Sequence, residues 1–289
     1  MEYLVHLLIL ATIYLTLVLS LNLLLGYAGL LAVGHVGFYC LGAYVFTLLL
    51  SNTGAGFLPA LILGAVACAA VGFVVGVPAL RLRGDYFVLA SLAFLVVVYA
   101  ATYNWVSLTR GPYGITAIPR PRLGFVTLDS SVAFLACAAL FALISVAVLA
   151  LLGRSPFGRA LKAIRENEIA AQSLGKNTPR LKVLAFGIAG GIAGVAGALY
   201  ASYMSYIDPT AFYIDQTILV LSMVLIGGAG NIKGPVVGTL VVLALPELLR
   251  FLRVPEMVAP QIRQIIFGLA IVLLMRYRPN GLAGEYRFE

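Results

Sequence analysis

The chain has 289 residues, of which 62% are hydrophobic and only 10% are charged. Soluble domains carry about 25% charged residues, so this composition excludes a water-soluble globule and indicates an all-α polytopic integral membrane protein. The formal net charge is +8, and in a membrane protein such an excess is expected to reflect topology and not nucleic-acid binding.

A membrane-spanning helix needs about 20 mostly apolar residues, and nine stretches of the chain approach or exceed that length. We therefore expect about nine spans, within a range of eight to ten, in a single transmembrane domain that covers 1–289. The connection at 26–29 is predicted to be either a tight hairpin or a break within one irregular helix. The expected spans are 4–25, 29–50, 57–80, 85–104, 131–152, 183–206, 214–229, 234–250 and 262–276.

Lys and Arg residues in short loops indicate the cytoplasmic side of a membrane protein. The segment 153–182 is the most basic connection, and counting outward from it places Arg81, Lys233 and the C-terminal tail on the cytoplasmic side as well. The N-terminus is then expected outside. The loop 105–130 disagrees, because it carries three arginines and is placed outside, and we interpret it as a possible docking surface.

Two glycine-rich stretches resemble each other, "GYAGLLAVGHVG" at 26–37 and "GGAGNIKGPVVG" at 227–238. They are either matching breaks in two halves of a transporter or two unrelated hairpins. Asn22 and His35 are the deepest polar residues of the expected spans, where polar groups often mark function. We expect His35 to be neutral and bonded to a carbonyl, or else to contact substrate or protons. The candidate translocation-path or hinge residues are Asn22, Gly26, Gly29, Gly34, His35, Gly37, Gly227, Gly228 and Gly230.

The basic segment 154–180 is predicted to contain one amphipathic helix of about five turns, too polar to span. Ser155 and Pro156 form a helix start, and Gly175 forms a stop. An apolar stripe is expected to run from Phe157 to Leu174, with the charged residues on the other faces. Such a helix either lies at the lipid interface or docks into a groove on a soluble partner.

Small residues recur at four-residue spacing in the stretch 185–203, which favours close helix packing in lipid; a pore lining is the alternative. The three cysteines lie in apolar runs and indicate core positions, not a disulfide framework or a metal site. The sequence contains no ATP-binding or hydrolytic motif. The candidate helix-packing residues are Gly187, Gly190, Gly191, Gly194 and Gly197.

Five blocks together resemble the permeases of ATP-binding-cassette importers for branched-chain amino acids, the LivM/LivH type. They are "LNLLLGYAGLLAVGHVGFYCLGAY" (21–44), "GRALKAIRENEIAAQSLGKN" (158–177), "LKVLAFGIAGGIAGVAGALY" (181–200), "IGGAGNIKGPVVG" (226–238) and "RPNGLAG" (278–284), the last of which is closer to LivM. The resemblance implies a cytosolic coupling helix between spans five and six. The general importer motif begins Glu-Ala-Ala, and here Ile169 stands in place of the Glu. The implied ATPase-coupling residues are Arg159, Lys162, Arg165, Glu166, Ala170, Ala171 and Gly175.

The resemblance further implies a transport subunit, not an enzyme, in a bacterial or archaeal cytoplasmic membrane. Its partners would be a second, LivH-like permease subunit, two ATP-binding subunits, an extracytoplasmic substrate-binding protein and membrane lipid. This chain would bind no cofactor, while ATP and magnesium would act on the ATP-binding subunits. The alternatives are a permease for urea or short amides, a proton-coupled secondary transporter that uses His35, and a passive channel.

Overall fold

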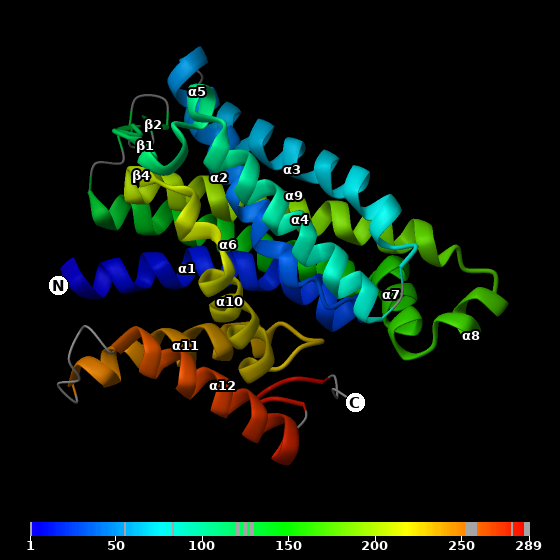
Figure 1. Ribbon diagram of the computed structural model, residues 1–289. Helices are drawn as coiled ribbons and strands as arrows, with labels where there is room; N and C mark the ends of the chain where they lie inside the picture. The colour runs from blue at the N-terminus through cyan, green and yellow to red at the C-terminus, as the bar shows by residue number, and fades with distance from the viewer. Residues whose placement is uncertain are drawn as a thin grey trace.

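The computed structural model describes residues 2–54, 56–82, 84–119, 122–123, 126–127, 130–251, 259–278 and 280–285. Long helices form most of it (Figure 1). They are α1 (Glu2–Asn22), α2 (Val36–Thr53), α3 (Phe57–Ala79), α4 (Asp85–Asn104), α6 (Ser131–Arg154), α9 (Thr178–Met204), α10 (Ile214–Gly227), α11 (Lys233–Phe251) and α12 (Ala259–Tyr277). The shorter helices are η1 (Leu23–Tyr27, a π-helical turn), η2 (Val33–His35), α5 (Val106–Thr109), η3 (Gly111–Tyr113), α7 (Pro156–Glu166), α8 (Glu168–Ser173) and η4 (Pro209–Phe212).

Seven helices within the described residues are long and apolar enough to cross a membrane, and they coincide with the first seven expected spans. They are Glu2–Tyr27, Val33–Thr53, Phe57–Ala79, Asp85–Asn104, Ser131–Arg154, Thr178–Met204 and Pro209–Gly227. The chain is therefore a helical, multi-pass membrane protein. In the ninth expected span the apolar part of the helix is shorter, Gln264–Leu274, and the count of nine stays a prediction.

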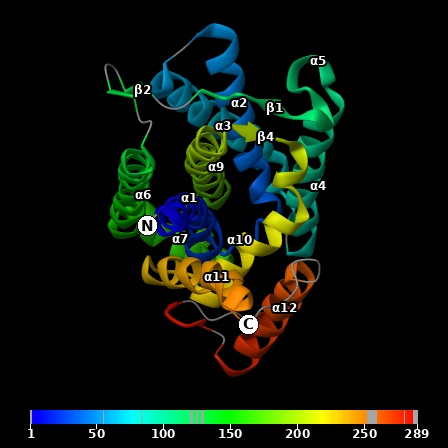
Figure 2. The same ribbon diagram turned by 90° about the vertical axis from the view of Figure 1, so that its left-hand side faces the viewer.

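Helix α9 lies in the middle of the bundle, with α1, α2 and α3 around it (Figure 2). The close approach depends on glycine. A Cβ atom on Gly42 of α2 would lie 2.4 Å from Gly194 Cα, and one on Gly197 would lie 2.1 Å from Tyr39 O. Gly187, Gly190 and Gly191 also face neighbouring helices, where a Cβ would meet Phe73, Cys68 and Ala65 atoms respectively. In lipid, where packing drives helix association, such contacts hold the bundle together.

Two short antiparallel ladders depart from the all-α expectation. Strand β1 (Ile115–Thr116) pairs with β4 (Tyr206–Ile207), and β2 (Arg122–Leu123) pairs with β3 (Val126–Thr127). The first ladder ties the loop 105–130, of which Arg120 lies outside the described residues, to the end of α9. The ladders and the N-terminus lie at one end of the molecule, whereas α7, α8 and the C-terminus lie toward the other (Figure 1).

Candidate functional site

The connection between the first two spans is an irregular turn. Helix α1 ends in the π-helical turn η1, after which Leu30 N donates across six residues to Leu24 O at 2.9 Å. Gly29 has a φ of +68°, which glycine adopts at little cost. The 3₁₀ turn η2 then leads into α2. The glycines of this stretch thus reverse the chain between two spans, so the hairpin prediction is the better of the two.

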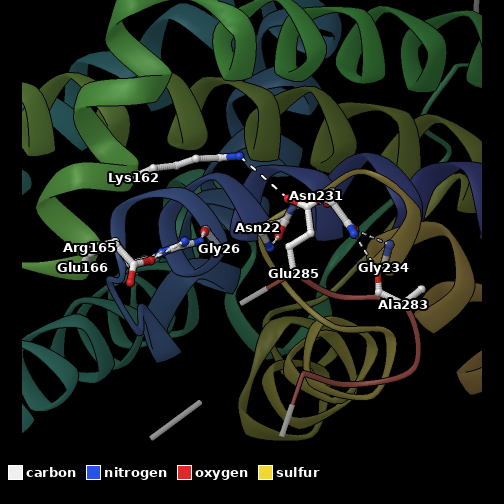
Figure 3. Close-up of polar contacts among 10 residues, drawn as sticks. Asn22, Gly26, Lys162, Arg165, Glu166, Asn231, Gly234, Ala283 and Glu285 are labelled. Carbon is white, nitrogen blue, oxygen red and sulfur yellow. Dashed lines mark hydrogen bonds and ion pairs between the residues drawn. The ribbon is translucent and has the colours of Figure 1, made fainter. Parts of the chain in front are cut away.

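Asn22 joins this turn to the second glycine-rich stretch, more than 200 residues away in sequence (Figure 3). Its side chain is fully buried. Asn22 Nδ2 donates to Asn231 O at 2.8 Å, and Oδ1 accepts from Gly230 N at 3.0 Å. A Cβ on Gly26 would lie 2.3 Å from both Asn22 Oδ1 and Gly230 N. The two stretches that look alike in sequence therefore touch, backbone against backbone.

The C-terminal tail completes this contact from the other side. Leu282 N donates to Ile226 O at 3.0 Å, and Ala283 N donates to Gly227 O at 2.9 Å. The amide of Asn231 donates to Ala283 O at 2.6 Å and accepts from Gly234 N at 2.8 Å. Gly228, at a φ of +95°, leaves no room for a Cβ beside Asn280 O, 2.3 Å away. Tail and loop form one hydrogen-bonded unit.

Helix α7 lies against this unit through two cations. Arg165 Nη1 donates to Gly26 O, and its stem packs on Gly29, where a Cβ would lie 2.9 Å from Arg165 Cγ. Lys162 Nζ lies 3.9 Å from Glu285 Oε2 and 5.1 Å from the centre of the Tyr27 ring. Figure 3 shows both side chains reaching from α7 toward the turn, the loop and the tail. We call the residues of this contact the junction: Asn22, Gly26, Tyr27, Gly29, Lys162, Arg165, Asn231 and Glu285.

The prediction of one long helix over 155–175 is wrong, because the segment is broken at Asn167. Helix α7 is capped by Ser155, whose Oγ accepts from Gly158 N at 3.2 Å. Asn167 is extended (φ −156°), and its Oδ1 accepts from Ala170 N at 2.9 Å to cap α8. A cap side chain of this kind offers the backbone an alternative to continuing the helix.

The break also changes which faces are exposed. Leu161 and Ile164 of α7 are buried as expected, and so is Ala171. Leu174, expected on the same stripe, is 79% exposed, and Ile169 is 71% exposed. Of the predicted coupling residues, Arg159, Glu166, Ala170 and Gly175 are exposed and Lys162 is half-buried. Arg165 was expected on the outer face, but its side chain is only 10% exposed because it points into the junction.

Helix α8 is held rigidly against the start of α9. Glu168 accepts a hydrogen bond from Thr178 Oγ1 at 3.0 Å and lies 2.8 Å from Lys182 Nζ. Gln172 Nε2 donates to the same Thr178 hydroxyl at 2.8 Å. Figure 1 shows α7 and α8 projecting from the end of the bundle. We call the segment from α7 to Gly175 the elbow. Its exposed end carries two apolar side chains, Ile169 and Leu174.

His35 lies apart from the junction, between α1 and α2. Ser20 Oγ donates its single hydrogen to Leu17 O at 2.6 Å, so His35 Nε2, 2.7 Å from Ser20 Oγ, must be the donor of that bond. Nδ1 has no hydrogen-bond partner among the described residues, so a proton on it would be buried without an acceptor. The expected carbonyl partner is instead a hydroxyl, and nothing described beside Nδ1 would relay a proton.

The remaining path candidates pack helices. A Cβ on Gly34 would lie 1.6 Å from Ser91 O of α4, and one on Gly37 would lie 2.8 Å from the Phe94 ring. Gly227 faces Gly234 and Gly238 of α11. The sequence did not point to Asn231 or Glu285, nor to the exposure of Ile169 and Leu174. An Asn within a glycine-rich turn is a recognisable signal, but no local pattern marks the others.

Comparison with known proteins identifies the family. A family model described as a branched-chain amino acid transport system permease component matches residues 3–275. The chain belongs to this family. The high-affinity branched-chain amino acid transport system permease protein LivM of Escherichia coli is 35% identical to this chain, with 94% of this chain and 68% of that protein covered.

Two further relatives carry similar names. The LivM protein of Salmonella typhimurium is 35% identical, with 93% of this chain and 67% of the relative covered. A probable branched-chain amino acid transport permease protein LivM from Methanocaldococcus jannaschii is 30% identical, with 78% and 68% covered. No solved structure matches the chain.

Proposed function

We propose that this chain is the transmembrane permease subunit of an ATP-binding-cassette importer and forms part of the translocation path for branched-chain, hydrophobic amino acids. Family membership and the names of the relatives support the transported class. A second permease subunit, two ATP-binding subunits and an extracytoplasmic binding protein complete the transporter. ATP and magnesium act on the ATP-binding subunits, and this chain performs no chemistry.

The exposed end of the α7–α8 elbow carries the proposal for coupling. Large apolar side chains that stand exposed on a polar, projecting element offer a contact surface to a protein partner. Ile169 and Leu174 are such side chains, and the bonds of Glu168 to Thr178 and Lys182 fix the helix that presents them. A rigid elbow transfers a displacement to the bundle, whereas a loose one would absorb it.

The cationic end of the molecule faces the cytoplasm in this proposal, and the N-terminus lies outside. Arg154, Arg159, Lys176 and Arg180 all lie in or beside the elbow, as the positive-inside rule requires. With nine spans, the C-terminal tail is also cytoplasmic. The protein then resides in the cytoplasmic membrane of a bacterium or archaeon, with lipid around it.

Transport proceeds by alternating access. The ATP-binding subunits bind ATP and draw the elbows of the two permease subunits together, and this biases the permeases toward one of two conformations. A ligand can shift such an equilibrium only as far as its affinities for the two states differ. The elbow must therefore contact the ATP-binding subunit differently in the two states.

Reconstitution tests the proposed function. We expect proteoliposomes that contain the whole transporter and external binding protein to accumulate radiolabelled leucine only with ATP inside. Excess valine or isoleucine should compete, and urea should not. Leucine uptake by this chain alone, driven by a pH gradient, would contradict the proposal, as would competition by urea but not by valine.

A matched pair of substitutions tests docking at α8. We expect Leu174→Asp to abolish co-purification of the ATP-binding subunits, because it places a charge in an apolar contact. Leu108→Asp makes the same change on the short helix α5, at the opposite end of the molecule, and should leave co-purification intact. If Leu174→Asp co-purifies as well as Leu108→Asp, the elbow is not the docking element.

A further inference from the structure

We propose that Arg165 is a positioning residue that transmits movement of the elbow to the turn at Gly26–Gly29. Through this contact, ATP hydrolysis is coupled to transport. The proposal rests on the proposed function. It assigns to one side chain the step between docking of the ATP-binding subunit and movement of the spans. Arg165 touches neither substrate nor nucleotide in this scheme and acts through the Gly26 carbonyl.

Arg165 is the cation of α7 that is bonded to the turn between the first two spans. Its side chain is 10% exposed, and its Nε and Nη2 lie 2.9 and 2.5 Å from Glu166 Oε1, which fixes the guanidinium plane. Nη1 donates to Gly26 O. Because a guanidinium presents its donors in a rigid fork, it can hold a carboxylate and a carbonyl at once.

The Gly26 carbonyl lies where a helix ends, and the last carbonyls of a helix have no partner within it. A charged donor is therefore a strong partner for this group. The contact is tight, because a Cβ on Gly29 would lie only 2.9 Å from Arg165 Cγ. Movement of α7 along its axis must consequently push or pull the turn at Gly26–Gly29.

The turn passes that movement on. Gly26 abuts both Asn22 Oδ1 and Gly230 N, so a displacement of Gly26 cannot be absorbed locally. Asn22 holds the 230–231 loop, and Asn231 holds the tail at Ala283. One carbonyl thus connects the elbow to the ends of α1 and α10 and to the C-terminal tail.

The other connection of the elbow leads to a stiffer element. Glu168 binds Thr178 and Lys182 at the start of α9, which runs unbroken for 27 residues and packs tightly on α2 and α3. The turn borders a cavity of about 440 Å³ lined by Gly29, Leu30 and Arg165, among others. Glu168 and Lys182 line the same cavity, but α9 is held in place by its packing on α2 and α3. The turn therefore has room to shift, and α9 serves as the pivot.

The test measures leucine uptake and ATP hydrolysis in the same proteoliposomes. We expect Arg165→Gln to retain assembly and ATP hydrolysis but to lose uptake per ATP by about tenfold or more, as the loss of one charge-assisted hydrogen bond predicts. Arg165→Lys keeps a charged donor and should recover part of the uptake. Arg81→Gln is the matched control, since Arg81 is an exposed arginine in the connection between α3 and α4, outside the elbow.

Each outcome decides the question. Unchanged uptake per ATP in Arg165→Gln would overturn the proposal. So would a parallel fall of assembly, ATP hydrolysis and uptake in both Arg165 variants, because that pattern identifies a folding or docking residue. A wild-type transporter that does not assemble or take up leucine would instead overturn the proposed function, which keeps the two failures distinct.

Discussion

Replacing Asn22 by Ala should destabilise the protein far more than the same replacement at an exposed helix end. Asn22 is fully buried, and its amide provides two hydrogen bonds to the 230–231 loop. Its removal leaves Gly230 N–H buried without a partner, and it leaves Asn231 C=O half-buried. Since an unsatisfied buried group costs about 1–3 kcal/mol and a half-buried one less, the expected loss in free energy of unfolding is about 2–4 kcal/mol.

Asn104→Ala is the matched control. Asn104 is the last residue of α4 and donates to Ala100 O at 2.8 Å, but it is exposed, so water replaces the lost partner. We expect a loss of no more than about 1 kcal/mol. Both substitutions change Asn to Ala at a helix end, so the gain in helix propensity largely cancels in the comparison.

The free energy of unfolding can be measured by circular dichroism as SDS is added to the purified protein in mixed micelles. If Asn22→Ala is no more destabilising than Asn104→Ala, the hydrogen bonds between α1 and the 230–231 loop do not hold the junction together. The reasoning would also fail if Asn22→Ala left both the free energy of unfolding and the hydrogen exchange of residues 228–231 unchanged.

Three further predictions concern packing, capping and thiol access. Gly34→Ala should prevent stable folding, because its Cβ would lie 1.6 Å from Ser91 O, whereas Gly268→Ala, with nothing within 4 Å, should be neutral or slightly stabilising in the same SDS titration. Asn167→Ala removes the cap of α8 and should cost about 1 kcal/mol, seen as faster hydrogen exchange in α8 alone; unchanged exchange would contradict the role of the cap. Maleimide should label no cysteine of the folded protein and all of them after SDS unfolding, because all are buried: Cys40, Cys68 and Cys137.

The spans could be predicted from the sequence because their signal is local. A run of about 20 apolar residues defines a spanning helix whatever surrounds it, and the first seven runs correspond to helices of the structure. The glycine-rich turn at 26–29 could also be predicted, because a cluster of glycines between two apolar runs is a local signal. Asn22 stood out because a polar residue deep in an apolar run is costly unless it is bonded.

The partners of these residues could not be predicted, because they depend on contacts between segments far apart in the chain. Asn22 and Gly230 are 208 residues apart, and Arg165 and Gly26 are 139 apart. Periodicity placed Arg165 on the outer face of one continuous helix. In the structure that helix ends at Asn167, whose backbone is extended. The guanidinium of Arg165 points inward and donates to the carbonyl of Gly26.

The junction is built from backbone groups that broken helices leave without partners. Such groups are costly when they are buried without a partner, so the breaks are stabilised by docking against one another. Here the turn after α1, the loop after α10 and the C-terminal tail satisfy one another, and Asn22 and Asn231 supply the side chains that connect them. The three segments are therefore joined by hydrogen bonds into one unit. Helix α7 contacts that unit at two points, through Arg165 on the Gly26 carbonyl and through Lys162 beside Glu285 of the tail.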